Sequence, residues 1–374
     1  MKEKIIAFVK KETVLVIATI LAIISAFFVT PSAAYLDYID WRVLGILLSL
    51  MTIMAGLQKS GLFDTIGIWL LEKTKNTRQL SIILVFLCFF FSMLITNDVA
   101  LLTFVPFAML TLQKCRQEKL LIPVIVLQTL AANLGSMLTP IGNPQNLYLY
   151  NLSGMGASEF IMFMLPYTVT SAVLILLGIF IVQRKKETIT VSLQEAEKES
   201  KKKTTYKNAV YITLFALCLF VVARLLPYHI VLLLILMLVF YMDRAVLKKV
   251  DYCLLLTFIS FFIFTGNMGN IPWIKETLQQ LVSGRELAIG ILSSQVISNV
   301  PAALLLSGFT ENYQELLKGV NIGGLGTMIA SMASLISYKI YANAYNEKKG
   351  SYFKWFTLAN ILFLIALVGV AVIC

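Results

Sequence analysis

The stretch SMLITNDVALL (residues 92–102) places three polar residues, Thr96, Asn97 and Asp98, inside a long apolar run. A carboxylate at the centre of a bilayer costs roughly 2.5–3.5 kcal/mol even on the lenient insertion scale, so its presence there needs a reason. A second run, ISNVPAALLLS (297–307), is interrupted at the matching place by Ser298 and Asn299. We predict that both surrounding segments, 80–112 and 285–310, form helical hairpins that enter the membrane and turn back, because neither suits one plain crossing.

The composition predicts an all-α integral membrane protein. Of its 374 residues, 59% are hydrophobic and 14% are charged, whereas globular domains are roughly 45–50% apolar and about 25% charged. The apolar runs suit membrane-crossing helices, and the alternation typical of an outer-membrane barrel is missing. The net charge of +11 does not predict a nucleic-acid partner, because the basic residues lie between apolar spans. The five cysteines lack metal-type spacing and the single histidine is far from the polar motifs, so we expect no cofactor and no enzyme.

The basic residues also predict the orientation in an inner or plasma membrane. With hairpins that do not cross, 26 of the 31 Lys and Arg residues fall on one side, which the positive-inside rule assigns to the cytoplasm. The N-terminus is then cytoplasmic and the C-terminus lies outside. Simple spans are expected near 13–30, 41–58, 120–150, 160–183, 209–225, 228–243, 251–266, 319–345 and 352–374.

The two halves of the chain repeat each other. Residues 48–74 align loosely with 257–284, and 133–146 align with 321–334 at a constant offset. Because the span at 209–225 carries the chain across the membrane before the second copy begins, the repeats are expected to be inverted. Inverted repeats with interrupted helices at matching positions indicate the central site of a secondary transporter.

The interruptions supply the chemistry of that site. Gly135, Pro140, Gly142 and Pro144 disfavour a continuous helix through 133–146, and Gly323, Gly324 and Gly326 favour unwinding in the second copy. Freed carbonyls suit a small cation, and the N-termini of half-helices suit an anion. No Lys or Arg lies within these motifs. The candidate substrate- and ion-binding residues are Thr96, Asn97, Asp98, Asn133, Thr139, Gly142, Asn143, Asn146, Ser298, Asn299, Asn321, Thr327, Ser331 and Ser334.

Each of these residues also has a structural interpretation. Asn and Ser in membrane helices often serve only as interhelical hydrogen bonds of about 1 kcal/mol or less. Asp98 is either a cation ligand or titrating group, or a capping or protonated residue at the hairpin tip. The paired positions Asn97/Asn299 and Asn133/Asn321 favour a binding site.

The motifs ITNDVALLTFVP (95–106), TPIGNPQN (139–146) and ISNVPAALLLS (297–307) resemble those of the ion transporter superfamily. That group includes divalent-anion:sodium symporters, citrate transporters, arsenite permeases and one class of sodium/proton antiporters. The resemblance implies an elevator mechanism, often in a homodimer, and sodium ions at Asn97, Asn133, Asn299 and Asn321. It implies scaffold helices in 1–79 and 209–284, transport-domain halves in 80–183 and 285–374, and a basic cytoplasmic linker at 184–208.

The function expected from these features is secondary active transport of a small anion across the lipid bilayer, coupled to Na+ or H+, with a carboxylate as one candidate. Thr96-Asn97-Asp98 and Ser298-Asn299-Val300 differ from the Ser-Asn-Thr tips of the dicarboxylate symporters. Arsenite- or antimonite-type efflux and Na+/H+ exchange are therefore the alternatives. A passive channel could use the same interrupted helices but could not concentrate its substrate.

Overall fold

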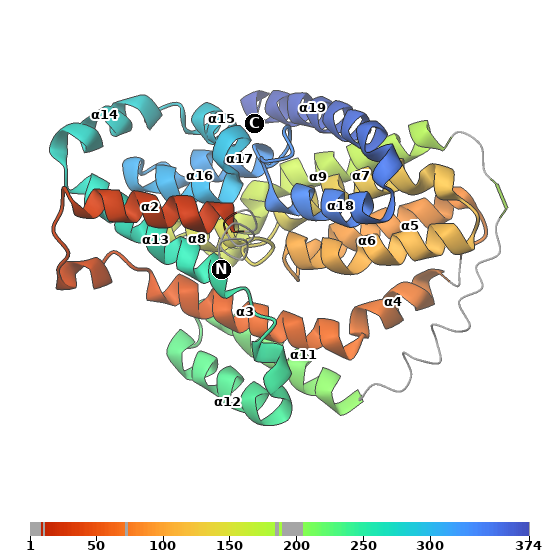
Figure 1. The fold of residues 1–374 in the computed structure, drawn as a ribbon, viewed down its shortest axis with the longest axis horizontal. Helices are drawn as coiled ribbons and strands as arrows, with labels where there is room; N and C mark the ends of the chain where they lie inside the picture. The colour runs from red at the N-terminus through yellow and green to blue at the C-terminus, as the bar shows by residue number, and fades with distance from the viewer. Residues whose placement is uncertain (1–8, 10–11, 72–73, 184–186, 189–204, 374) are drawn as a thin grey trace.

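The computed structural model describes residues 9, 12–71, 74–183, 187–188 and 205–373, and these are helical apart from short connections and one isolated bridge between Asn76 and Thr188 (Figure 1). Most of the predicted 184–208 linker lies outside the described residues. Six described helices are long and apolar enough to cross a membrane, in the segments 41–59, 118–136, 157–182, 228–247, 252–269 and 349–373. The chain is a multi-pass membrane protein.

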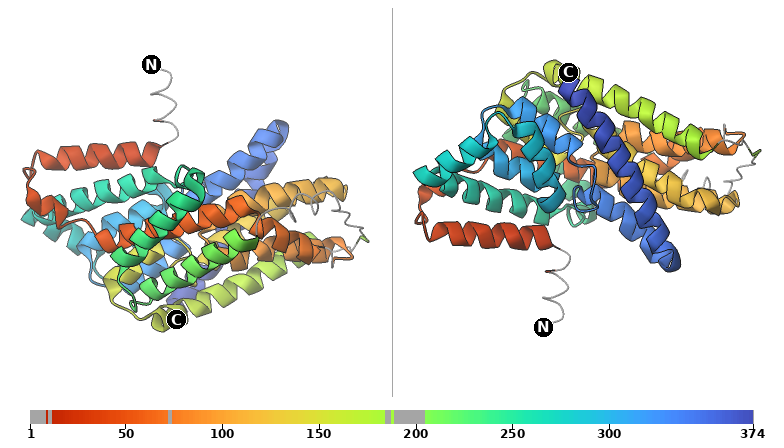
Figure 2. Two further views of the ribbon diagram at one scale, coloured as in Figure 1. Left: turned by 90° about the horizontal axis from the view of Figure 1, so that it is seen from below. Right: turned by 90° about the horizontal axis from the view of Figure 1, so that it is seen from above.

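One set of helices, here called the frame group, is packed around α3 and α13. It contains α2 (Thr13–Ala26), α3 (Trp41–Ser60), α11 (Thr205–Val222), α12 (Tyr228–Leu247) and α13 (Tyr252–Gly269). The short helices α4 (Leu62–Leu71) and α14 (Pro272–Val282) follow α3 and α13. Helices α11 and α12 pack on α3, whereas α2 packs on α13, beside which it lies at the edge of the molecule in both views of Figure 2.

The second set, the hairpin group, contains both expected hairpins. Helices α5 (Thr77–Ser92) and α6 (Asn97–Lys114) form the first, and α15 (Glu286–Ile297) and α16 (Asn299–Leu306) form the second. In Figure 1 the first hairpin lies to the right of the centre and the second to the left. Ser298, the single residue between α15 and α16, has φ 74°, a left-handed conformation that a serine adopts only under local constraint.

The spans expected at 120–150 and 319–345 are each two helices. The first divides into α7 (Leu121–Ser136) and α8 (Pro144–Ser153), and the second into α17 (Tyr313–Ile322) and α18 (Met332–Ala344). The long helices α9 (Ala157–Val182) and α19 (Lys349–Ile373) follow these pairs, and all six of these helices belong to the hairpin group. The breaks are therefore at 137–143 and 323–331.

The prediction that Gly135 belongs to the unwound segment is wrong, because α7 continues through it. A Cβ at position 135 would lie 2.1 Å from the carbonyl oxygen of Phe89 on α5. Glycine is therefore required there so that two helix backbones can approach closely.

Candidate functional site

Four helices begin at one polar centre. The N-cap residues of α6, α8, α16 and α18 are Thr96, Asn143, Ser298 and Ser331. Asn143 acts as a side-chain cap, since its Oδ1 accepts a hydrogen bond from the backbone N–H of Asn146 over 2.8 Å. Each helix N-terminus carries a partial positive charge, and these positive ends meet in a part of the molecule that has no Lys or Arg in its motifs.

Each hairpin tip is bonded to the neighbouring helix break in the same way. The backbone N–H of Asn97 donates to the carbonyl of Gly142 over 3.1 Å, and the N–H of Asn299 donates to the carbonyl of Ala330 over 2.9 Å. Positions 142 and 330 differ by the same offset as the aligned sequence motifs. The asparagine at each tip is therefore held by a main-chain hydrogen bond to the unwound segment of its own half.

The two interrupted helices also bind each other. Asn143, at the first break, donates from its amide to Oδ1 of Asn321 over 3.2 Å. Ser331, the aligned residue at the second break, donates from its hydroxyl to Oδ1 of Asn133 over 2.9 Å. Each break is thus joined to the asparagine at the end of the opposite half-helix.

The same two asparagines make a second matched pair of contacts. The amide of Asn321 donates to Oδ1 of Asn146 over 2.7 Å, and the amide of Asn133 lies 3.4 Å from the hydroxyl of Ser334. All four side chains are buried. The arrangement brings together the aligned polar positions of both halves in one network.

One contact breaks this symmetry. The amide of Asn97 donates to Oδ1 of Asn133 over 3.1 Å, but Asn299 makes no equivalent bond to Asn321. Among the described residues, no group accepts a hydrogen bond from Nδ2 of Asn299, which lies 2.9 Å from the position that a Cβ on Gly324 would occupy. The Asn299 amide is therefore a donor available to a bound solute.

The remaining predicted residues lie around this network. The hydroxyl of Thr139 donates to the carbonyl of Met93, and the hydroxyl of Ser298 donates weakly to that of Ala330. Thr96 makes no side-chain cap. Thr327 is exposed and bonded to the carbonyl of Gln295, so the structure does not bring it into the network.

Asp98 lies in the first turn of α6, where its negative charge complements the helix dipole. Its side chain is half-buried, and within the described part of the chain nothing donates a hydrogen bond to its carboxylate or pairs with it. A carboxylate without a protein partner in the first turn of a hairpin helix is suited to bind a cation or a proton.

Two residues that form hydrogen bonds at the helix breaks are missing from the sequence prediction. Ser136 accepts a hydrogen bond from the amide of Asn143 over 3.2 Å. Gln295, one turn before the second tip, donates to the carbonyls of Gly323 and Leu325, each over 2.9 Å, and accepts from the N–H of Thr327. Its polarity inside an apolar hairpin helix was the available signal.

Gly142 has no room for a side chain. A Cβ there would lie 2.0 Å from the carbonyl oxygen of Ser136, so only glycine allows the unwound segment to fold back onto the end of α7. This close approach keeps the Gly142 carbonyl directed at the N–H of Asn97.

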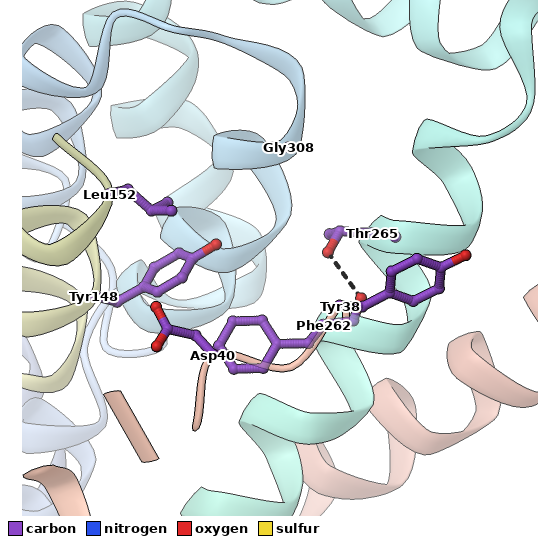
Figure 3. Close-up of a pocket in the computed structure, with 8 residues that line it drawn as sticks. Tyr38, Asp40, Tyr148, Leu152, Phe262, Thr265 and Gly308 are labelled. Carbon is purple, nitrogen blue, oxygen red and sulfur yellow. Dashed lines mark hydrogen bonds between the residues drawn. The ribbon is translucent and has the colours of Figure 1, made fainter. Parts of the chain in front are cut away.

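A pocket of about 270 Å³ lies away from the polar centre, between the frame group and the hairpin group. Figure 3 shows Tyr148 and Leu152 of α8 and Gly308 facing Phe262 and Thr265 of α13. Tyr38, Asp40 and Gly266 complete its lining. None of the predicted binding residues lines this pocket.

Comparison of the amino-acid sequence with known proteins finds transporters among its relatives. The family model described as citrate transporter matches residues 4–314. An uncharacterized transporter of Methanocaldococcus jannaschii is 35% identical over 335 residues, which cover 89% of this chain and 90% of that protein. An inner membrane protein of Escherichia coli is 31% identical over 81% of this chain and 80% of its own length. A silicon efflux transporter of Oryza sativa is 30% identical over 129 residues, 34% of this chain and 26% of the rice protein.

These matches confirm the resemblance to the ion transporter superfamily that the paired hairpin motifs carry. The chain belongs to the citrate transporter family, and it is a membrane transporter rather than an enzyme.

Proposed function

We propose that the protein is a secondary active transporter that moves a small anion, with a carboxylate as the first candidate, in exchange with or together with Na+ or H+. The observation that carries this proposal is the matched network in which Asn133 and Asn321 each bind the opposite helix break. Such a network supports two inverted repeats that share one site at the middle of the membrane. The N-termini of α6, α8, α16 and α18 would attract the anion.

The hairpin group is the part that we propose to move. It holds the polar centre, whereas the frame group contributes none of the residues in the network. An elevator movement of the hairpin group along the frame would carry the site across the membrane without rearranging its hydrogen bonds. The frame helices would remain fixed in an inner or plasma membrane, with the N-terminus in the cytoplasm.

Two alternatives use the same residues. The unpaired carboxylate of Asp98 would repel an anion unless a proton or a bound cation neutralises it, and the motifs hold no Lys or Arg, so a neutral or cationic solute is the alternative substrate. Arsenite- or antimonite-type efflux fits a site built of amides and hydroxyls, and the silicon efflux transporter among the relatives supports export. Na+/H+ exchange fits a carboxylate that binds one cation at a time.

The deciding experiment uses the full chain in proteoliposomes loaded with a pH-sensitive dye. An inward Na+ gradient is applied first without any organic anion, and then with carboxylates and oxyanions added one at a time. We expect no change in the pH of the lumen until one anion is added. That anion should then accumulate against its gradient. Alkalinisation of the lumen by Na+ alone would instead identify an exchanger, and equilibration without accumulation would identify a channel.

A further inference from the structure

The C-terminal end of α8 is bonded to the frame group at a cluster that we call the α8 clasp. The clasp contains Asp40, Tyr150, Asn151, Gly154, Val222 and Arg224. The amide of Asn151 donates to Oδ2 of Asp40, and the hydroxyl of Tyr150 donates to the carbonyl of Val222 over 3.1 Å. Nη1 of Arg224 donates to the carbonyl of Gly154 over 3.2 Å, and its Nη2 lies 3.4 Å from the carbonyl of Tyr150.

The frame side of the clasp is fixed by bonds of its own. Asp40 is the N-cap of α3, where its Oδ1 accepts from the N–H of Val43 over 3.0 Å. Arg42 donates to the carbonyl of Val221 over 2.9 Å, which ties the end of α11 to the start of α3. These contacts do not involve α8, so the frame side would keep its shape if α8 moved away.

Arg224 itself has φ 63°, a left-handed conformation that is costly for a residue with a Cβ. This conformation accompanies a guanidinium that lies over the Tyr150 ring, with 5.3 Å between Cζ and the ring centroid. The guanidinium also bonds the last carbonyls of α8, where a positive charge complements the helix dipole.

The other end of α8 reaches the polar centre. The helix is ten residues long, so it spans about 15 Å from end to end. Asn146, in its first turn, accepts the hydrogen bond from Asn321. A rigid helix with one end in the site and the other in the clasp cannot move along the frame while the clasp is closed.

We propose that the α8 clasp is a releasable latch that holds the hairpin group against the frame in the conformation seen here and opens once in each transport cycle. This inference rests on the proposed function, because it assumes that the hairpin group moves. The clasp is suitable for repeated opening because its members are joined by single hydrogen bonds, its arginine is exposed, and no buried ion pair has to be broken.

The first test locks the latch. In a background without the five native cysteines, Asp40→Cys is combined with Asn151→Cys, and transport is measured after oxidation and again after reduction. We expect oxidation to reduce transport at least tenfold and reduction to restore it. The matched control is Ser25→Cys with Asn267→Cys, two residues of the frame group that bond over 2.8 Å; its cross-link should leave transport unchanged. Normal transport by the cross-linked protein would contradict the proposal that the clasp opens in each transport cycle.

A second test does not depend on transport. Arg224→Gly removes the guanidinium and suits the left-handed turn, so the fold should be kept. We expect this change to raise several-fold the rate at which a thiol reagent labels the protein that carries Asn151→Cys in membranes. Arg116→Gly is the control, because Arg116 has φ 55° and lies far from α8 in the sequence, after α6. An unchanged labelling rate would exclude the latch even if no transported solute were found, whereas a faster rate without any transport would count only against the proposed function.

Discussion

Asn143 donates its amide to Oδ1 of Asn321 over 3.2 Å, and so joins the first helix break to a residue of α17 that lies 178 positions further along the chain. Ser331 makes the aligned contact with Asn133. Because each contact crosses from one half of the chain to the other, the polar centre exists only when both halves are folded together. A change at either asparagine should therefore affect the whole site.

Replacing Asn321 by leucine tests that dependence. The substitution leaves Oδ1 of Asn146 and part of the Asn143 amide without partners, and each buried polar group left unsatisfied costs about 1–3 kcal/mol. We expect a lower thermal unfolding midpoint in detergent and at least a tenfold loss of transport. Asn133→Leu should behave alike, because Asn133 bonds Asn97 and Ser331.

The control for these variants is Asn360→Leu on α19. Asn360 is also fully buried, but among the residues that the structure describes its amide bonds only the carbonyl of Phe356 and its Oδ1 has no partner. Removing it should leave stability unchanged or raise it, with transport intact. Equal transport by the Asn321 and Asn360 variants would show that the asparagine network stabilises the fold but has no role in transport.

Gly142→Ala tests the close approach at the first break. The added methyl group would lie 2.0 Å from the carbonyl oxygen of Ser136, so the backbone must shift, at a cost of about 1–3 kcal/mol for overpacking. We expect loss of transport together with reduced stability. Gly369→Ala on α19 meets open space and should instead gain up to about 1 kcal/mol from helix propensity. Comparable unfolding midpoints for the two variants would contradict the close contact.

Gln295→Ala tests the second break. Gln295 holds the carbonyls of Gly323 and Leu325 and the N–H of Thr327, so its loss should free the segment 323–331. We expect faster hydrogen exchange in that segment than in the wild-type protein and weaker transport. Gln314→Ala on α17 is the control, because within the described part of the chain the Gln314 amide bonds only the sulfur of Met155. Unchanged exchange in 323–331 would show that Gln295 is not needed to order the break.

The sequence predicts much of this architecture because the helix breaks coincide with residue types that disfavour a helix. Pro140, Pro144 and the glycines cannot continue a helix easily, and apolar runs of membrane-crossing length surround them. The constant offset between 133–146 and 321–334 then predicts which residues correspond. What the sequence could not give are long-range contacts with no local pattern, such as the bond from Arg224 to the end of α8. It also could not show that Gly135 serves helix packing, since an unwound segment and a close helix contact both require glycine.

Asp98→Asn tests how transport is coupled. If the Asp98 carboxyl carries the coupling proton, the wild-type rate should change with pH as the group titrates. The asparagine variant, which cannot titrate, should give a flat pH profile and lose at least tenfold in its maximal rate. Asparagine keeps the size of the side chain and suits the start of a helix, so the fold should survive. Glu159→Gln is the matched control, because Glu159 caps α9 through the N–H of Gly156 and glutamine preserves that contact.

If the same carboxylate is a cation ligand, the Asp98→Asn variant should bind Na+ less tightly than the wild-type protein. Equilibrium binding of Na+ to the purified protein would measure this difference. A pH profile that is unchanged in the Asp98→Asn variant would exclude proton coupling at this position, and unchanged Na+ affinity as well would leave Asp98 as a helix-capping charge.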